Sequence, residues 1–444
     1  MKKTPTIPQW VQTEMKRVTH HRLVFSDVVG SLKDMNITGS EIAEVLELGQ
    51  GFDGSSVEGF VRLEESDLMA HPRLKSFRVL PDNLSGNGQP VGIFFCDIRT
   101  PEGRPFAGDP RQCLKRVLRR AKRLGYTFYV GPELEFFLFP DKTNPQPLDR
   151  EGYFDATAEG AGASVILDIV DTLEKIGIQV ECSHHEVAPS QFEIDVKYQE
   201  ALTAADQVML IRWVVKRIAQ AHGLYATFLP KPIFGRNGSG MHTHMSLFQG
   251  NKNAFFSRQH RTNLSKIARQ FMAGLLTYAP QFTLVTNQLV NSYKRIVPGY
   301  EAPCYLSWGQ RNRSSLIRVP RYRAGREKAT RIELRSPDPS CNPYLAFAVM
   351  LAAGLQGIEQ QLRLPKPVEE NIFNMPEAIR RKLNIGTLPG SLQEAVAIAE
   401  RSAFLRETLG NHILTALLNN KRKEWEDYRT RVSGWEIEHL MSRY

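Results

Sequence analysis

The sequence predicts an α+β protein of two domains, and three observations support this prediction. The chain has 444 residues, which is more than one hydrophobic core usually accommodates. Residues 20–98 alternate short extended runs with turns, which is typical of a small α+β domain. Residues 100–110 (TPEGRPFAGDP) are rich in proline and glycine, as domain boundaries often are. We therefore expect one domain at residues 1–105 and a second at residues 106–444.

The first domain contains extended runs at residues 21–25, 33–38, 76–80 and 91–97. One helix is expected at residues 40–48, with Ser40 as its N-cap. The glycines and serines of residues 51–56 (GFDGSS) predict a tight loop around Asp53, of the kind that often carries function.

The second domain combines long helices with strands that carry acidic residues. Helices are expected at residues 111–124, 162–176, 204–222 and 264–278, and the chain is mainly helical from residue 342 onward. The run 126–139 is rich in aromatic and β-branched residues and is expected to form a strand, as is the alternating run 192–196.

Composition is ordinary for a globular protein, with 42% hydrophobic and 23% charged residues. We expect a cytoplasmic protein without a membrane anchor, because no apolar run is long enough to span a bilayer and no signal peptide opens the chain. The five cysteines are scattered and form no CxxC pair, which favours reduced thiols. The net charge of +10 could indicate nucleic acid. However, the densest basic run, residues 114–124, has the apolar spacing of an amphipathic helix, so we expect a solvated face and no nucleic acid partner.

The strand at residues 131–139 (GPELEFFLF) carries the strongest chemical signal. Side chains alternate along a strand, so Glu133 and Glu135 share one face. Two neighbouring carboxylates repel each other and resist burial, and a divalent cation between them would remove both problems. The alternative is that both glutamates lie on the solvent face of an amphipathic strand.

Further acids and a histidine extend this inventory. Glu193 alternates with apolar residues in a second strand, Glu333 lies in a third, and Glu186 and His242 stand near such strands. A set of oxygen ligands with a single nitrogen suits Mg²⁺ or Mn²⁺ better than zinc.

Many arginines between residues 295 and 335 could bind phosphates or a carboxylate, because the guanidinium group forms paired hydrogen bonds with such groups. The glycines of residues 237–240 (NGSG) allow a backbone to approach a ligand closely. Metal ligands, arginines and a glycine loop are together typical of phosphoryl transfer from ATP. The chain has neither a P-loop nor the protein-kinase motifs, so the residues alone predict an ATP- and metal-dependent enzyme whose substrate stays open.

Seven motifs, in the same order along residues 20–444, resemble glutamine synthetase, in the shorter bacterial type I form of Gram-positive bacteria. These motifs are FDGSS (52–56), GPELEFF (131–137), SHHEV (183–187), NGSGMH (237–242), NSYKRIVPGYEAP (291–303), NRS (312–314) and RIELR (331–335). The resemblance implies a β-grasp-like first domain. It also implies a catalytic domain with a curved antiparallel sheet flanked by helices, as in the glutamine synthetase and guanido kinase fold.

The resemblance implies that ATP drives the ligation of ammonia to glutamate through γ-glutamyl phosphate, with two or more Mg²⁺ or Mn²⁺ ions per subunit. It assigns one metal to Glu135, Glu186 and Glu193, and the other to Glu133, His242 and Glu333. It assigns glutamate to Asn237, Gly238, Arg295, Glu301 and Arg335. It assigns the nucleotide to Glu181, His244, Ser246, Arg313, Arg318, Lys328 and Arg331. Catalytic roles fall to Asp53, Glu301 and Arg313.

The resemblance also implies a dodecamer of two hexameric rings, in which the Asp53 loop of one subunit completes the site of its neighbour. Regulation is expected through product feedback at Arg62, which would bridge Glu301 when glutamine is bound. The alternative for Arg62 is a surface ion pair with Glu64 or Glu65. Phe373 stands where longer type I enzymes carry an adenylylated tyrosine, so that switch should be absent.

Two other functions remain open. One is a γ-glutamyl ligase that uses an alkylamine or polyamine, against which the presence of both Asp53 and Glu301 argues. The other is a mainly regulatory relative that binds nitrogen-responsive transcription regulators, against which the complete ligand set argues.

Overall fold

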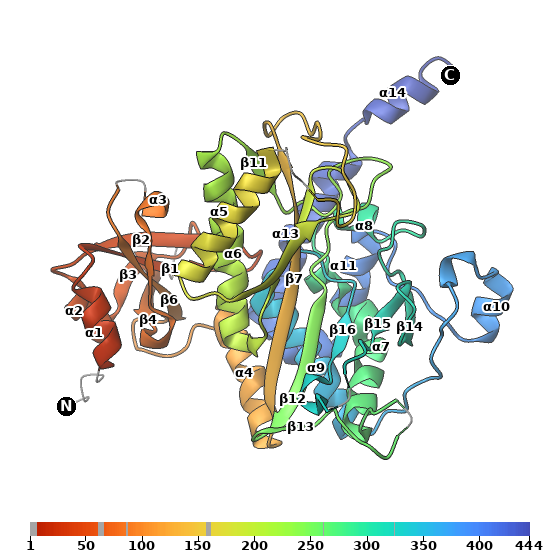
Figure 1. Cartoon of the computed structure of the whole chain (residues 1–444), viewed down its shortest axis with the longest axis horizontal. Helices are drawn as coiled ribbons and strands as arrows, with labels where there is room; N and C mark the ends of the chain where they lie inside the picture. Colours follow the sequence, from red (N-terminus) through yellow and green to blue (C-terminus); the bar gives the residue numbers. More distant parts are fainter. Residues whose placement is uncertain (1–6, 61–65, 86–87, 157–160, 261, 324) are drawn as a thin grey trace.

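The computed structural model describes residues 7–444 apart from 61–65, 86–87, 157–160, 261 and 324, and it confirms the α+β class. Figure 1 shows a smaller sheet at one end of the molecule and a larger sheet at its centre, with helices packed around the larger one. No helix within these described ranges is both long and apolar enough to cross a membrane.

The smaller sheet has the strand order β2-β1-β6-β4-β3, with β5 paired to β6. Only β1 and β6 run parallel among its paired strands. Its strands are β1 (His20–Ser26), β2 (Leu32–Thr38), β3 (Gln50–Asp53), β4 (Asp67–Pro72), β5 (Arg78–Leu80) and β6 (Val91–Arg99). The helical elements of this region are α1 (Gln9–Met15), α2 (Ile42–Leu48), η2 (Leu74–Ser76) and α3 (Asp82–Ser85).

The start of helix α2 corrects one prediction. The helix begins at Ile42 after Glu41, and Ser40 makes no capping hydrogen bond. The Ser40 hydroxyl lies 3.0 Å from the hydroxyl of Thr38 instead, because the intervening turn directs it back toward the preceding strand. Gly49 ends the helix with φ 86°, a left-handed conformation that glycine adopts without strain.

The larger sheet has the strand order β14-β15-β16-β12-β7-β9-β8, with β10 and β11 also paired to β7 and β13 to β12. Its pairs are antiparallel except for β14 and β15. Its strands are β7 (Thr127–Phe139), β8 (Val180–His185), β9 (Gln191–Val196), β10 (Gln199–Glu200), β11 (Tyr225–Thr227), β12 (Thr243–Gln249), β13 (Lys252–Asn253), β14 (Tyr305–Gly309), β15 (Ser315–Arg318) and β16 (Ile332–Leu334).

Helices supply most of the remaining core. They are α4 (Pro110–Arg123), α5 (Ala161–Lys175), α6 (Ala201–Ala221), α7 (Lys266–Thr286), α8 (Ser292–Arg295), α9 (Pro343–Glu359), α10 (Glu377–Lys382), α11 (Leu392–Glu400), α12 (Ala403–Leu409), α13 (Asn411–Arg429) and α14 (Gly434–Leu440), with the short η3 (Glu327–Ala329) and η4 (Ile372–Asn374). Helix α9 is buried on almost every side, as its apolar sequence requires. Gly274 of α7 allows close contact with α9, because a Cβ there would lie 2.0 Å from the Ala353 carbonyl oxygen.

A network of charged residues joins the smaller sheet to helices α4, α6 and α9. Arg111 of α4 donates to both carboxylate oxygens of Asp206 in α6, at 3.0 and 2.9 Å, and to Asp97 of strand β6. Lys115 also donates to Asp97 at 2.6 Å, and the Tyr344 hydroxyl donates to Asp206 at 2.7 Å. Because both carboxylates are paired, the network holds the first sheet against the helices of the second without an unpaired buried charge. Within the basic run of α4, Leu114, Val117 and Ala121 are buried in the core, as the amphipathic pattern predicts, whereas Leu124 is exposed.

Candidate active site

Acidic side chains face one another across strands β7 and β9. The antiparallel register places Glu135 opposite Glu193 and Glu133 opposite Asp195. Like charges in opposite positions destabilise a sheet. Alternation along β7 directs Leu134 and Phe136 into the core, where both are fully buried, so both glutamates lie on the cleft side. The predicted shared face is therefore present in the structure.

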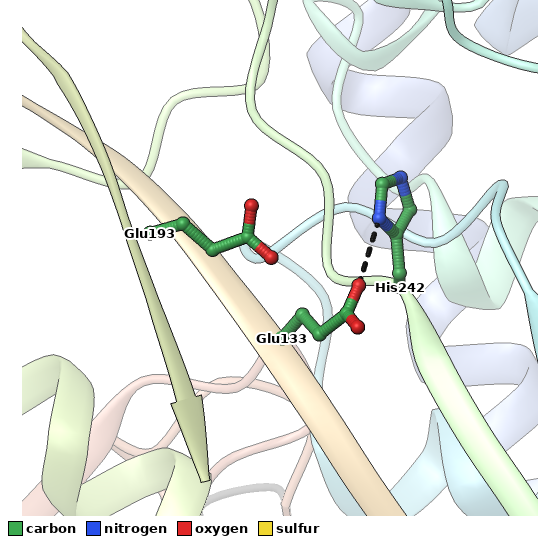
Figure 2. A group of neighbouring side chains, drawn as sticks. All are labelled: Glu133, Glu193 and His242. Carbon is green, nitrogen blue, oxygen red and sulfur yellow. Dashed lines mark hydrogen bonds and ion pairs between the residues drawn. The ribbon is translucent and has the colours of Figure 1, made fainter. Parts of the chain in front are cut away.

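His242, which immediately precedes strand β12, and His244 within this strand approach the same carboxylates. His242 Nδ1 lies 3.1 Å from Glu133 Oε2, and His244 Nε2 lies 2.6 Å from Glu133 Oε1. Figure 2 shows the carboxylate of Glu193 directed toward Glu133 and His242 from the neighbouring strand. Donor atoms of these three residues all lie within 4.8 Å of one another, which is compatible with a shared cation.

Strand β16 adds Glu333, whose side chain is almost completely buried. Arg318 of β15 donates to Glu333, and Arg335 Nε donates to it at 3.2 Å. Its carboxylate also lies 3.9 Å from His242 Nδ1 and groups with Glu133 and His244 as a second possible ligand set. Glu333 thus lies beside two arginines, Arg318 and Arg335, whereas Arg331 at the start of the RIELR motif contacts His244 instead.

Burial and mutual repulsion affect the ionisation of these acids. Burial, followed by the charge of Glu135, raises the pKa of Glu193 well above its ordinary value. Burial, followed by the charge of Glu133, raises the pKa of Asp195 to about 6. For Glu133 burial acts in the same direction, but hydrogen bonds with His242 and His244 outweigh it and lower the pKa. A site that crowds carboxylates so strongly fits a divalent cation, whose charge would offset their repulsion.

Neighbouring polar groups fix the orientation of the ligand side chains. The Glu135 carboxylate accepts hydrogen bonds from Gln191 Nε2 at 2.9 Å and from the Gly240 backbone at 3.0 Å. Glu186 follows strand β8, and its carboxylate accepts from the Val187 backbone at 2.9 Å. Such supporting contacts hold ligand atoms in place before a metal binds.

The other side of the cleft is formed by loops. Asn237 and Gly238 line it from the glycine-rich loop before β12, and Arg295 lines it from α8. The Arg295 guanidinium is buried and donates to the backbone carbonyl oxygens of Ser336 and Arg335 at 2.8 and 3.3 Å, which fixes its position. Exposed Glu301 and Arg313 complete the rim of a cavity of about 210 Å³.

The cleft brings together most of the residues that the sequence predicts. Its lining includes Glu133, Glu135, Glu186, Glu193, Asn237, Gly238, His242, Arg295, Glu301, Arg313, Arg318, Glu333 and Arg335. His244 and Arg331 lie directly beside it, because Arg331 Nε donates to His244 Nδ1 at 3.2 Å and His244 contacts Glu133.

Other predicted residues lie elsewhere in the chain. Ser246 is buried farther along β12, opposite Tyr129, while Glu181 and Lys328 are exposed outside the cavity lining. Asp53 ends β3 at the edge of the smaller sheet, where it is exposed and accepts a 2.8 Å hydrogen bond from the Ser55 backbone. Arg62, with its alternative partners Glu64 and Glu65, lies outside the described residues.

Several cleft residues were not assigned to the site from the sequence. Tyr153 and Phe154 lie in an irregular loop, and the Arg313 guanidinium lies 5.8 Å from the Tyr153 ring centre. His184 also lines the cavity, and its Nε2 atom lies 3.7 Å from Glu193 Oε2. Gln191 and Asp195 also line the cavity, and the acidic alternation of residues 192–196 was a usable signal for Asp195.

Comparison with family models divides the chain between two matches. A model described as the glutamine synthetase beta-Grasp domain matches residues 17–101, and one described as the glutamine synthetase catalytic domain matches residues 107–440. The predicted β-grasp-like first domain and the larger catalytic domain are thereby confirmed.

Whole-length relatives are similar along almost the entire chain. Glutamine synthetase of Thermotoga maritima is 49% identical over 96% of this chain and 97% of its own. That of Staphylococcus aureus is 47% identical over 97% of both chains. A solved GmaS/ADP complex superposes with a TM-score of 0.88 at 31% identity and covers 98% of this chain and all of its own. The cryo-EM structure of Plasmodium falciparum glutamine synthetase gives 0.86 at 24% identity over 97% of each chain, which supports the fold alone.

Proposed function

Because the chain belongs to the glutamine synthetase family, we propose that it ligates ammonia to glutamate with ATP, through γ-glutamyl phosphate, to give glutamine, ADP and phosphate. The observation that carries this proposal is the single cleft in which acidic residues and a histidine face several arginines. The similar structure solved in complex with ADP supports the binding of an adenine nucleotide.

We propose that Glu135, Glu186 and Glu193 hold one divalent cation and that Glu133, His242 and Glu333 hold the other. Bound Mg²⁺ or Mn²⁺ would offset the negative charges of the nucleotide phosphates and of the glutamate carboxylate. The crowded carboxylates and their fixed orientations support this assignment. His244, which contacts Glu133, and Arg331, which contacts His244, would border the nucleotide on the β12 side.

The arginines divide between the two anionic substrates. Arg313 and Arg318 would contact the phosphates, while Arg295 and Arg335 would bind the carboxylates of glutamate with Asn237 and Gly238. The buried position of Arg295 and its fixed backbone contacts favour recognition of a substrate in one orientation. Nucleotide roles for Glu181, Ser246 and Lys328 require a ligand that extends beyond the cavity.

Ammonium is proposed to lose its proton to Asp53 of a neighbouring subunit, with Glu301 closing the site. Within the described residues the cavity lining does not include Asp53, and Figure 1 places its sheet at one end of the molecule. Backbone donation from Ser55 lowers the pKa of Asp53, which keeps this carboxylate ionised at neutral pH. These observations support a homo-oligomer, for which we propose a dodecamer of two hexameric rings. Within each chain, we propose that the first domain ends at residue 105 and the second begins at residue 106.

Purified protein should form glutamine from glutamate, ammonium and ATP only when Mg²⁺ or Mn²⁺ is present. The same assay with alkylamines and polyamines in place of ammonium tests the second candidate function, a γ-glutamyl-amine ligase. Preferential use of an amine over ammonium would replace the proposed reaction with that one. Consumption of ATP without formation of glutamine or of a γ-glutamyl amide would contradict both candidate functions.

A further inference from the structure

Lys231 lies between the glycine-rich loop (residues 237–240) and residues 297–304, the segment that carries Glu301 and that we call the flap. Its backbone N–H donates to Asn291 Oδ1 at 2.7 Å, and Asn291 Nδ2 donates to its carbonyl at 3.0 Å. This paired contact fixes the start of the side chain. The Lys231 ammonium group then donates to the carbonyl oxygen of Arg236, the residue that precedes Asn237.

The same ammonium group lies 3.7 Å from the centre of the Tyr300 ring. A cation at this distance is attracted by the aromatic face, and more strongly where water is partly excluded. Lys231 is half-buried, and burial, followed by the charge of Arg295, lowers its pKa to about 8. Because neutral pH lies below this pKa, Lys231 is protonated in most molecules, as the aromatic contact requires.

Tyr300 immediately precedes Glu301, whose backbone is strained. Glu301 has φ 59°, and the Ala302 N–H donates to the Tyr300 carbonyl at 2.8 Å across it. This three-residue turn with a positive central φ is rare and costs free energy outside glycine. Such a turn persists only where neighbouring contacts hold it, and Lys231 provides one of them through Tyr300.

We propose that Lys231 is a positioning residue that couples the glycine-rich loop, which would bind glutamate, to the flap and so keeps the flap closed. The inference rests on the proposed function, in which γ-glutamyl phosphate must be shielded from water. If the flap opens early, water attacks the γ-carbonyl carbon and the bond from this carbon to the phosphate oxygen breaks. Glutamate and inorganic phosphate are then released, so ATP is consumed without formation of glutamine.

The decisive measurement is the number of ADP molecules formed per glutamine in the full-length protein. Lys231→Met keeps the length of the side chain but removes its charge, and it should raise this ratio about tenfold, with little change in the KM for ATP. Lys231→Arg keeps a cation over the ring and should restore most of the coupling. Lys294→Met is the matched control, since the Lys294 ammonium lies over the Tyr428 ring at 5.2 Å and Lys294 is not among the cavity-lining residues.

Hydrogen exchange of the peptide spanning residues 297–304 supplies a second readout that does not depend on turnover. With glutamate, Mg²⁺ and a non-hydrolysable ATP analogue bound, this peptide should exchange about tenfold faster in Lys231→Met than in the wild type or in Lys231→Arg. An unchanged ratio and unchanged exchange would overturn the inference. If the wild type forms no glutamine, the proposed function itself fails, which is a different result.

Discussion

The two halves of the cleft differ in how the fold supports them. On one side, Glu133, Glu193 and Glu333 project from paired strands and have fixed partners in the same chain. On the other side, Glu301 lies exposed on a strained turn, and Asp53 lies on the smaller sheet. Under the proposed function, one chain would supply the ligands for cations and phosphates, while ammonium selection would depend on the segment that carries Glu301 and on a second subunit.

Glu135→Gln should have the largest effect, because it removes a charge from the strand-built half. Loss of the ligand is expected to lower glutamine formation about a thousandfold, as several kcal/mol of charge stabilisation disappear. The amide can still accept from Gln191 and the Gly240 backbone, so the fold should persist. Assays with Mn²⁺ titration and thermal unfolding would separate these effects, and wild-type activity in this variant would exclude Glu135 as a ligand.

Asp53→Ala should lower kcat about a hundredfold, the contribution of a general base, and leave metal binding intact. Mixed oligomers of Asp53→Ala and Glu135→Gln sharpen the comparison further. If each site combines Asp53 from one subunit with Glu135 from another, random mixing should restore about a quarter of wild-type activity. Recovery that stays at the level of the separate variants would place both residues in the site of one chain, or outside the site altogether.

Arg62→Ala should weaken inhibition by glutamine about tenfold and spare turnover. The expected cause is loss of a charge-assisted hydrogen bond with Glu301 in the product complex. Inhibition curves for the variant and for Glu64→Gln as a control would measure the effect. Equal inhibition of wild type and Arg62→Ala would leave Arg62 with the surface ion-pair role.

Glu193→Gln should lower activity as Glu135→Gln does, because both remove a ligand of the same cation. The smallest expected effect is on stability, since this variant should be slightly more stable than the wild type in metal-free protein. The Glu193 carboxylate is buried opposite Glu135, so neutralising it relieves repulsion worth about 1 kcal/mol. In EDTA the melting temperature should rise by about 1 °C. Added Mn²⁺ should stabilise the wild type more than this variant, and a larger shift in the variant would contradict a ligand role.

The sequence predicts the strand-built half well because alternation is a local property. Glu133 and Glu135 differ by two positions, so their shared face follows from strand geometry alone. Ser40 shows the limit of local patterns, since a turn directs its hydroxyl toward Thr38 instead of the helix. Periodicity could not find Tyr153 and Phe154, because they reach the cleft from an irregular loop.

The roles of substrate-binding residues came from resemblance instead of physical pattern. No spacing rule connects Asn237 with Arg295, which meet only because the large sheet and α8 bring distant segments together. The Tyr300–Lys231 contact is similarly invisible in the sequence, since it depends on the path of two loops.

The central position of β7 restricts which length changes this part of the chain can tolerate. The strand pairs with β9 on one side and β12 on the other, so neither edge can slide independently. One residue inserted between Phe128 and Glu133 would turn every side chain of the preceding segment to the opposite face of the sheet. Side chains that now lie in the core would then point toward solvent. Insertions and deletions should therefore accumulate in loops such as residues 140–156, where an added residue disturbs no ladder. In a scan of single-residue insertions, tolerance should fall abruptly at Thr127 and return after Phe139, which would make β7 recognisable from genetic data alone.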